Sequence, residues 1–297
     1  MKRYWIAGLL VLTLLLSLLT GCGSKKQENT EEETLQPQVQ EDPDTLVCCN
    51  GTTTLRFHKE DDKWVWFDDT DFPLDQSYVQ TLLDTLQSLR ELTPITLTGE
   101  LADYGLESVK SYVMLSDKSG NESYIYLGKK TDNGYYMFDG APEDGVYVAP
   151  AALLDQISRS IYDMALLPSF PQLTLDDIEA LDVNCGEKEL HLTVKDGVWY
   201  DGGADVTANM ADVTDALSRL AVTSCVDYRP ASGAPAICGL TDGAAVLKVT
   251  YGGEKTLTLT IGAQRNSDGY FAQMNEDTTI YLLPTELAKP LLTLAKG

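Results

Sequence analysis

The cysteines are the side chains of this sequence with the clearest potential for chemistry, and one of the six has distinctive surroundings. Cys22 follows a basic start, Lys2 and Arg3, and then an uncharged leucine-rich run from Trp5 to Leu19. This run is shorter than the roughly 20 residues that a membrane-spanning helix needs, and its order is typical of a cleaved export signal. Because a thiolate is a good nucleophile, we expect covalent chemistry at Cys22.

The tetrapeptide Leu19-Thr20-Gly21-Cys22 resembles the lipobox of bacterial lipoproteins. The resemblance implies signal cleavage between Gly21 and Cys22, transfer of diacylglycerol to the Cys22 sulfur, and acylation with fatty acids such as palmitate. Two or three acyl chains give stable anchoring, because each buried CH₂ contributes ~0.8 kcal/mol. We therefore expect a lipid-anchored protein on the extracytoplasmic face of the cell membrane. The alternative is an uncleaved anchor helix with an incidental cysteine.

The charge balance excludes two kinds of partner. The 297 residues include 45 Asp and Glu against 22 Lys and Arg, which gives a net charge of −23. Nucleic acid and anionic lipid head groups both require clustered basic side chains, so neither is expected to bind directly. A hydrophobic content of 43% predicts a folded chain. Membrane attachment is therefore assigned to the lipid on Cys22.

Composition predicts five segments along the chain. A lipoprotein signal peptide covers residues 1–21, and a disordered acidic tether that begins with the lipidated cysteine covers residues 22–45. A first module is expected over residues 46–163 and a second over residues 172–297. The stretch 164–171 contains two prolines and is predicted to be the junction.

The two modules repeat one pattern at a nearly constant displacement. The matched residues include Trp64 and Trp199, Leu83 and Leu217, Gly105 and Gly239, Gly128 and Gly262, and Gly134 and Gly269. So long a repeat excludes a solenoid, whose units have about 20–50 residues. The sequence therefore predicts a tandem duplication of a domain-sized module.

Periodicity predicts the structure of each module. Alternating apolar residues over Tyr112–Leu115 and Tyr124–Leu127 indicate paired strands, and helical spacing over Gln76–Glu91 indicates an amphipathic helix. Asp75 is the expected N-cap of this helix, and Asn209 is the corresponding residue in the second copy. The predicted fold is α+β, a tandem duplication of an antiparallel-sheet module with flanking amphipathic helices.

These motifs are similar to those of the domain-of-unknown-function 4340 (DUF4340) family of bacterial envelope lipoproteins. The residues that carry the resemblance are Tyr104-Gly105-Leu106, Leu127-Gly128, Gly134-Tyr135-Tyr136 and Val146-Tyr147-Val148. The resemblance extends from Thr45 to the C-terminus and implies a duplicated sheet domain outside the cytoplasmic membrane. It also implies a partner, an ABC-type transporter complex of the gliding-motility kind, and it supplies no catalytic residues. The second copy departs from the pattern, with Cys238 in place of Tyr104.

No set of residues has the spacing of an active site or a metal site. His58 and His191 alternate with apolar neighbours, so both are expected to point away from the core, and neither has a partner at zinc-ligand spacing. Asp176 and Asp177 are expected to open a short helix. We therefore expect no catalytic residue, no metal, no cofactor and a non-enzymatic role.

The remaining five cysteines are an odd number, so they cannot all pair within the chain. Cys225 and Cys238 flank a short loop, and both a disulfide between them and free thiols remain open. The vicinal pair Cys48 and Cys49 lacks the Cys-x-x-Cys spacing of redox sites.

The aromatic residues supply the candidate binding surface. Tyr112, Met114, Tyr124 and Tyr126 fall on the strand face opposite the core, where the second copy has Val246, Lys248, Thr258 and Thr260. This apolar face is expected either to pack against the second module or junction, or to bind a protein partner. The alternative function is a solute- or glycan-binding lipoprotein, although Trp64 and Trp66 alternate with the core and are expected inside it.

Overall fold

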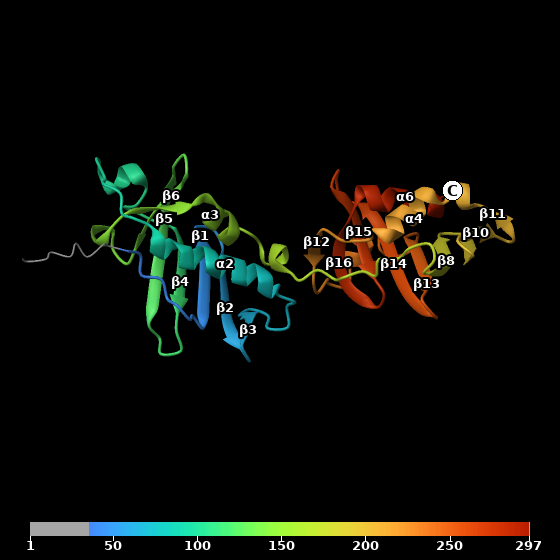
Figure 1. Ribbon diagram of the computed structural model, residues 1–297, viewed down its shortest axis with the longest axis horizontal. Helices are drawn as coiled ribbons and strands as arrows, with labels where there is room; N and C mark the ends of the chain where they lie inside the picture. The colour runs from blue at the N-terminus through green and yellow to red at the C-terminus, as the bar shows by residue number, and fades with distance from the viewer. Residues whose placement is uncertain (1–35, 297) are drawn as a thin grey trace, which may run out of the picture. The chain divides into compact units, whose positions relative to one another are not determined.

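Seven antiparallel strands form the first sheet. The computed structural model describes residues 36–296, and this sheet has the order β3-β2-β1-β4-β5-β6-β7 (Figure 1). Its strands are β1 (Thr45–Asn50), β2 (Thr54–Glu60), β3 (Lys63–Trp66), β4 (Ser111–Ser116), β5 (Glu122–Lys130), β6 (Gly134–Asp139) and β7 (Tyr147–Pro150). We call residues 36–164, which carry this sheet, the first half.

Helices α2 (Gln76–Ser88) and α3 (Ala151–Ile157) pack on the core face of this sheet. Helix α2 begins as predicted, because the Asp75 carboxylate accepts a hydrogen bond from the Ser77 backbone N–H at 2.9 Å. Its buried side chains have the spacing of one helical face and are Val79, Leu82, Leu83 and Leu86. They fill the core together with the inward residues of β4 and β5.

Nine antiparallel strands form the second sheet, in the order β11-β10-β9-β8-β13-β14-β15-β16-β12. They are β8 (Ile178–Cys185), β9 (Lys188–Lys195), β10 (Val198–Asp201), β11 (Ala204–Asp205), β12 (Ser224–Asp227), β13 (Ala245–Tyr251), β14 (Lys255–Gln264), β15 (Gly269–Met274) and β16 (Asp277–Pro284). Without β11 and β12, this order matches that of the first sheet strand by strand. We call residues 172–296 the second half.

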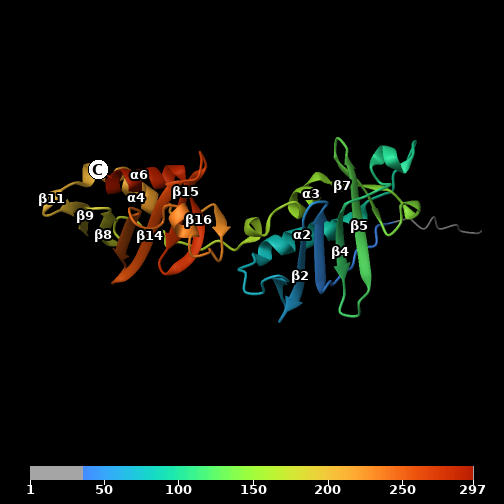
Figure 2. The same cartoon turned by 180° about the vertical axis from the view of Figure 1, so that it is seen from behind.

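Three helices belong to the second half: α4 (Ala211–Ser218), α5 (Ala234–Ile237) and α6 (Thr285–Lys296). Figure 2 shows α4 and α6 side by side, and α6 packs against the strands of the second sheet. The fold is therefore α+β, with two antiparallel sheets. Short 3₁₀ turns complete it: η1 (Leu89–Glu91), η2 (Leu101–Tyr104), η3 (Pro142–Asp144), η4 (Ile161–Met164) and η5 (Thr207–Asn209).

The N-cap of helix α4 lies one residue later than predicted. Met210 occupies the N-cap position that was expected for Asn209. Asn209 is instead the last residue of the 3₁₀ turn η5, which the Met210 backbone N–H closes by donating to the Thr207 carbonyl. The prediction of an Asn209 cap was wrong because this extra turn precedes the helix.

The tryptophans within residues 36–296 pack into the cores. Trp199 is fully buried, and its indole N–H donates to the Thr214 hydroxyl at 3.0 Å. Trp64 is 7% exposed, and Trp66 is half-buried against Phe72 at a centroid distance of 5.6 Å. Trp64 and Trp66 are therefore packing residues, as predicted.

Matched glycines lie where another backbone segment approaches closely. A Cβ on Gly128 would lie 2.6 Å from the Tyr104 carbonyl oxygen, and one on Gly134 would overlap the Ala149 carbonyl oxygen. Their counterparts in the second half, Gly262 and Gly269, meet the carbonyl oxygens of Cys238 and Leu283. The repeated glycines therefore serve packing between strands and loops.

Residues 36–44 pack against the rest of the first half. Val39 is 2% exposed, and the Arg90 guanidinium donates to its carbonyl oxygen. The predicted tether over residues 22–45 therefore extends too far, because the polar composition concealed one apolar side chain that joins the core. The remainder of the tether and the signal peptide lie outside the described residues.

The predicted junction lies in the segment between η4 and β8. Apart from the isolated bridge of Ala165 with Leu74, this segment contains no helix or strand. Leu173 within it is 2% exposed and belongs to the core.

Candidate functional site

Four side chains on the outer face of the first sheet form what we call the tyrosine face: Tyr112, Met114, Tyr124 and Tyr126. The strand register places Tyr112 opposite Tyr126 and Met114 opposite Tyr124. All four are half-buried. The residues between them face the core and are buried: Val113, Leu115, Ile125 and Leu127. Since side chains alternate along a strand, the four predicted residues lie together on the opposite face.

The tyrosine rings overlap one another. Tyr124 and Tyr126 are stacked, with centroids 5.8 Å apart and an interplanar angle of 9°. Tyr112 lies 6.2 Å from each of them, and Tyr126 also stacks on Phe138 at 4.9 Å. Parallel rings at this separation cover part of each other's faces. The Tyr126 ring, between Tyr124 and Phe138, is therefore the one that its neighbours cover most.

The apolar surface extends beyond the predicted four residues. Val47 on β1 faces Met114 in register and is 7% exposed, as is Phe138 on β6. Near the other edge of the sheet, the ring of Phe67 is 57% exposed and lies under the Arg56 guanidinium at 5.0 Å. Sequence reasoning missed Phe138, although the run Tyr136-Met137-Phe138 is apolar on both strand faces.

One carboxylate adjoins the tyrosine face. The Tyr124 hydroxyl donates to Glu122 Oε2 at 2.9 Å. This hydrogen bond to Glu122 raises the pKa of the Tyr124 phenol above its ordinary value, and partial desolvation acts in the same direction. Tyr124 is therefore a neutral hydrogen-bond donor at physiological pH.

The outer face of the second sheet is polar at the corresponding strands. Lys248 on β13 lies opposite Thr258 on β14, and Asp182 on β8 lies opposite His191 on β9. His191 Nδ1 is 2.6 Å from Asp182 Oδ1, and its side chain is 65% exposed. A shallow cavity of about 550 Å³ lies over these residues. The two outer faces thus differ in chemistry while their core faces agree.

Both histidines lie off the core, as predicted. His58 Nε2 is 2.9 Å from Glu60 Oε1, while its Nδ1 is buried without a hydrogen-bond partner. Within residues 36–296, no group of three His, Cys, Asp or Glu side chains has the geometry to hold a metal ion.

The pair Asp176 and Asp177 does not open a helix, contrary to prediction. Asp177 accepts hydrogen bonds from the Thr174 backbone N–H and hydroxyl, in a turn that leads directly into β8. These two hydrogen bonds lower the pKa of Asp177. The alternation of Leu181 and Val183 favours a strand over a helix here.

Comparison with protein families gives one match. Residues 64–243 match the domain of unknown function DUF4340. The chain belongs to the DUF4340 family. Comparison with curated proteins and with solved structures finds no match.

The family match in this DUF4340 protein begins at Trp64 in the first half and ends at Gly243 in the second. It includes the whole tyrosine face. No described helix is long and apolar enough to span a bilayer. Gly21 and Cys22, the predicted cleavage and lipidation residues, lie outside the part of the chain that the structure describes.

The five described cysteines of the DUF4340 protein are free thiols, including Cys225 and Cys238. Cys48 is 1% exposed, and burial raises the pKa of its thiol to about 12, with Cys49 as a smaller contribution. Burial, followed by the charge of Asp227, raises the pKa of Cys225 to about 11. Both thiols therefore stay protonated and unreactive at neutral pH.

We expect alkylation of the native protein by iodoacetamide at about pH 8 to separate these cysteines. Cys49 and Cys185 are half-buried and should react at least about tenfold faster than Cys48 and Cys225, which expose little surface and form little thiolate. Peptide mapping by mass spectrometry at successive times measures the rates. Equal rates at all four sites would contradict the buried, protonated state of Cys48 and Cys225.

Proposed function

We propose that this DUF4340 protein is a lipid-anchored lipoprotein on the extracytoplasmic face of the cell membrane, non-enzymatic, that binds a protein partner through the tyrosine face. The observation that carries the proposal is the contrast between the two outer sheet faces. One presents three tyrosines and a methionine, while the other presents a valine, a lysine and two threonines at the corresponding strand positions. Tyr and Met are enriched in protein interfaces, and large apolar patches on a free surface are uncommon.

The ring geometry favours a protein over a glycan as the partner. A sugar that stacks on an aromatic residue needs an uncovered ring face, and Tyr126 lies between Tyr124 and Phe138 in the stack. Ring edges and hydroxyls suit an interface of packed side chains and hydrogen bonds. For a solute-binding role, a cleft lined by both halves would be the supporting feature. The four described cavities each draw their lining from a single half.

For the partner we propose a subunit of an ABC-type transporter complex of the gliding-motility kind, which the family resemblance implies. A lipid anchor would concentrate the protein at the membrane that holds such a complex. Incorporation of a photo-crosslinking amino acid in place of Met114, in cells, identifies what contacts the tyrosine face. Recovery of transporter subunits would support the proposal, and recovery of nothing but neighbouring lipoproteins would count against it. The same amino acid in place of Lys248, on the polar sheet, is the control.

We also infer that the two halves are a tandem duplication with helices flanking each sheet. The shared strand order and the glycines at equivalent close contacts support this inference. Each sheet also has helices packed on its core face, α2 and α3 on one and α4 and α6 on the other. The proposed partner surface belongs to the first copy alone. After duplication, the first module would therefore bind the partner, while the second has a polar outer face.

Replacing Tyr124 and Tyr126 together by Ser is expected to weaken partner capture by at least about tenfold, because truncated aromatic anchors cost more than about 1.4 kcal/mol each. The melting temperature should change by only a few degrees, since Tyr124 lies outside the buried clusters and Tyr126 packs against the small cluster of Leu106, Phe138 and Val146, not against the main core. Pull-down and thermal unfolding measure the two quantities. Thr258→Ser with Thr260→Ser, at the corresponding positions of the second sheet, is the matched control. A large loss of stability with unchanged capture would show that these rings serve packing alone.

A further inference from the structure

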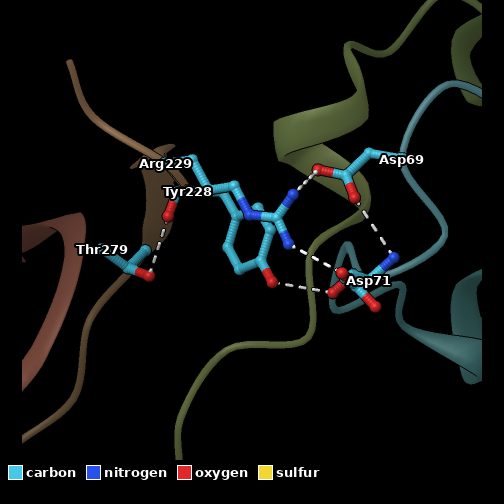
Figure 3. Close-up of polar contacts among 5 residues, drawn as sticks. All are labelled: Asp69, Asp71, Tyr228, Arg229 and Thr279. Atoms are coloured by element: carbon cyan, nitrogen blue, oxygen red, sulfur yellow. Dashed lines mark hydrogen bonds and ion pairs between the residues drawn. The ribbon is translucent and has the colours of Figure 1, made fainter.

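A polar contact joins the two halves at the loop between β3 and α2 (Figure 3). Arg229, just after β12, donates from Nη1 to Asp69 Oδ2 and from Nη2 to Asp71 Oδ2, both at 2.9 Å. The Tyr228 hydroxyl donates to the Asp71 carbonyl oxygen at 2.8 Å. The Thr279 hydroxyl on β16 donates to the Tyr228 carbonyl oxygen at 3.3 Å, which ties this segment to the second sheet. We call the Asp69, Asp71, Tyr228 and Arg229 contacts the clasp.

Aromatic rings lie beside the clasp. The Tyr228 ring meets Phe72 edge to face at 5.4 Å. Phe72, which is 4% exposed, also contacts Trp66 and Tyr162 of its own half at 5.6 and 6.1 Å. The second half thus inserts one tyrosine beside the aromatic cluster of the first.

The exposure of the clasp limits its strength. The Arg229 and Asp71 side chains are 57% and 77% exposed, while Asp69 is 23% exposed. Exposed ion pairs contribute little and are screened by salt, with a Debye length of about 10 Å at 0.1 M and 3 Å at 1 M. A guanidinium that bridges two carboxylates fixes direction better than a single ion pair does. The clasp is therefore specific in geometry and weak in energy.

We propose that the clasp is a releasable lock between the two halves. Closed, it fixes the second half to the loop between β3 and α2. Open, it leaves the halves connected by the segment between η4 and β8 and by the apolar contacts of β12 with η4 and of Tyr228 with Phe72. Relative motion is the default where such an interface is small. Rising ionic strength opens the lock, as does any ligand that competes for Arg229 or for its two carboxylates. This property is independent of the proposed partner and of the lipid anchor.

Distance measurements between the halves test the lock. Spin labels on unnatural amino acids at Ser119 and Glu254, which are exposed in the β4–β5 and β13–β14 turns, report one distance distribution in the full-length protein by electron–electron double resonance. We expect a narrow distribution at about 0.05 M NaCl and one at least about twofold broader at about 1 M NaCl. The same width at both salt concentrations would overturn the proposal.

Variants assign the effect to the clasp. Arg229→Gln should give the broad distribution at low salt, and Tyr228→Phe, which removes only the hydroxyl bond to Asp71, should give an intermediate width. Arg219→Gln is the matched control, because Arg219 is also 57% exposed but, directly after α4, pairs with Asp215 of the same half. Circular dichroism checks that each variant is folded. A narrow distribution for folded Arg229→Gln at low salt would overturn the lock, and broadening by Arg219→Gln would show that the clasp is not its cause.

Discussion

Cys22→Ser is expected to abolish fatty-acid incorporation and leave the signal peptide attached. In the lipobox chemistry that Leu19-Thr20-Gly21-Cys22 implies, the sulfur of Cys22 forms a thioether with diacylglycerol before cleavage occurs. A serine hydroxyl ionises far less readily than a thiol and does not replace it as the nucleophile. Metabolic labelling with a fatty-acid probe measures incorporation, and intact-mass spectrometry detects the retained residues 1–21.

Cys185→Ser is the matched control for this experiment. Cys185 is a half-buried free thiol in the second half, so its loss should leave labelling and processing unchanged. Normal labelling of Cys22→Ser would remove the basis for the lipid anchor. Loss of labelling in both variants would show a general effect of substitution and would not support a specific role of Cys22.

Gly134→Ala is expected to destabilise the first half by about 3 kcal/mol. The added methyl group would overlap the Ala149 carbonyl oxygen in the edge strand β7, and because that oxygen belongs to the backbone, β7 would have to shift to relieve the overlap. For a chain of this size, such a loss lowers the melting temperature by about 6–12 °C. Thermal unfolding followed by circular dichroism measures it, and Gly269→Ala should have an effect of the same sign in the second half, where the Leu283 carbonyl oxygen is the obstacle.

Gly233→Ala is the control for the glycine variants. Gly233 has a negative φ and open space where a Cβ would be, so alanine there should be neutral or slightly stabilising. A Gly134→Ala protein with an unchanged melting temperature would contradict the close approach of β6 and β7.

Local periodicity predicted much of the fold. Strict alternation along β4 and β5 was sufficient to place Tyr112, Tyr124 and Tyr126 on one face, because side-chain direction in a strand depends only on position. The Asp75 cap and the buried face of α2 follow from equally local rules. The repeated glycines predicted equivalence between the halves, although their reason, contact with carbonyl oxygens, required coordinates.

Contacts between distant segments could not be predicted. Arg229 and Asp69 form an ion pair although they lie 160 positions apart in the sequence. In a chain with 45 acidic residues, no local sequence pattern identifies which carboxylate pairs with a given arginine. The packing of Val39 could not be predicted for the same reason. A polar stretch with one apolar residue is typical of a tether, and only the structure shows the contact of Val39 with Arg90. At Asp176-Asp177, two adjacent acidic residues predicted the start of a helix. The residues that follow form the strand β8 instead, and Asp177 lies in the turn before it.

The two sheets have similar apolar core faces but different outer faces. Val113 and Leu247 are both fully buried on the strands that carry Tyr112 and Lys248 to the outside. Substitutions on the outer face therefore remove few core contacts. They can change what the surface binds without changing the stability of the fold. The core of each half thus supports an outer face whose chemistry can change one strand position at a time.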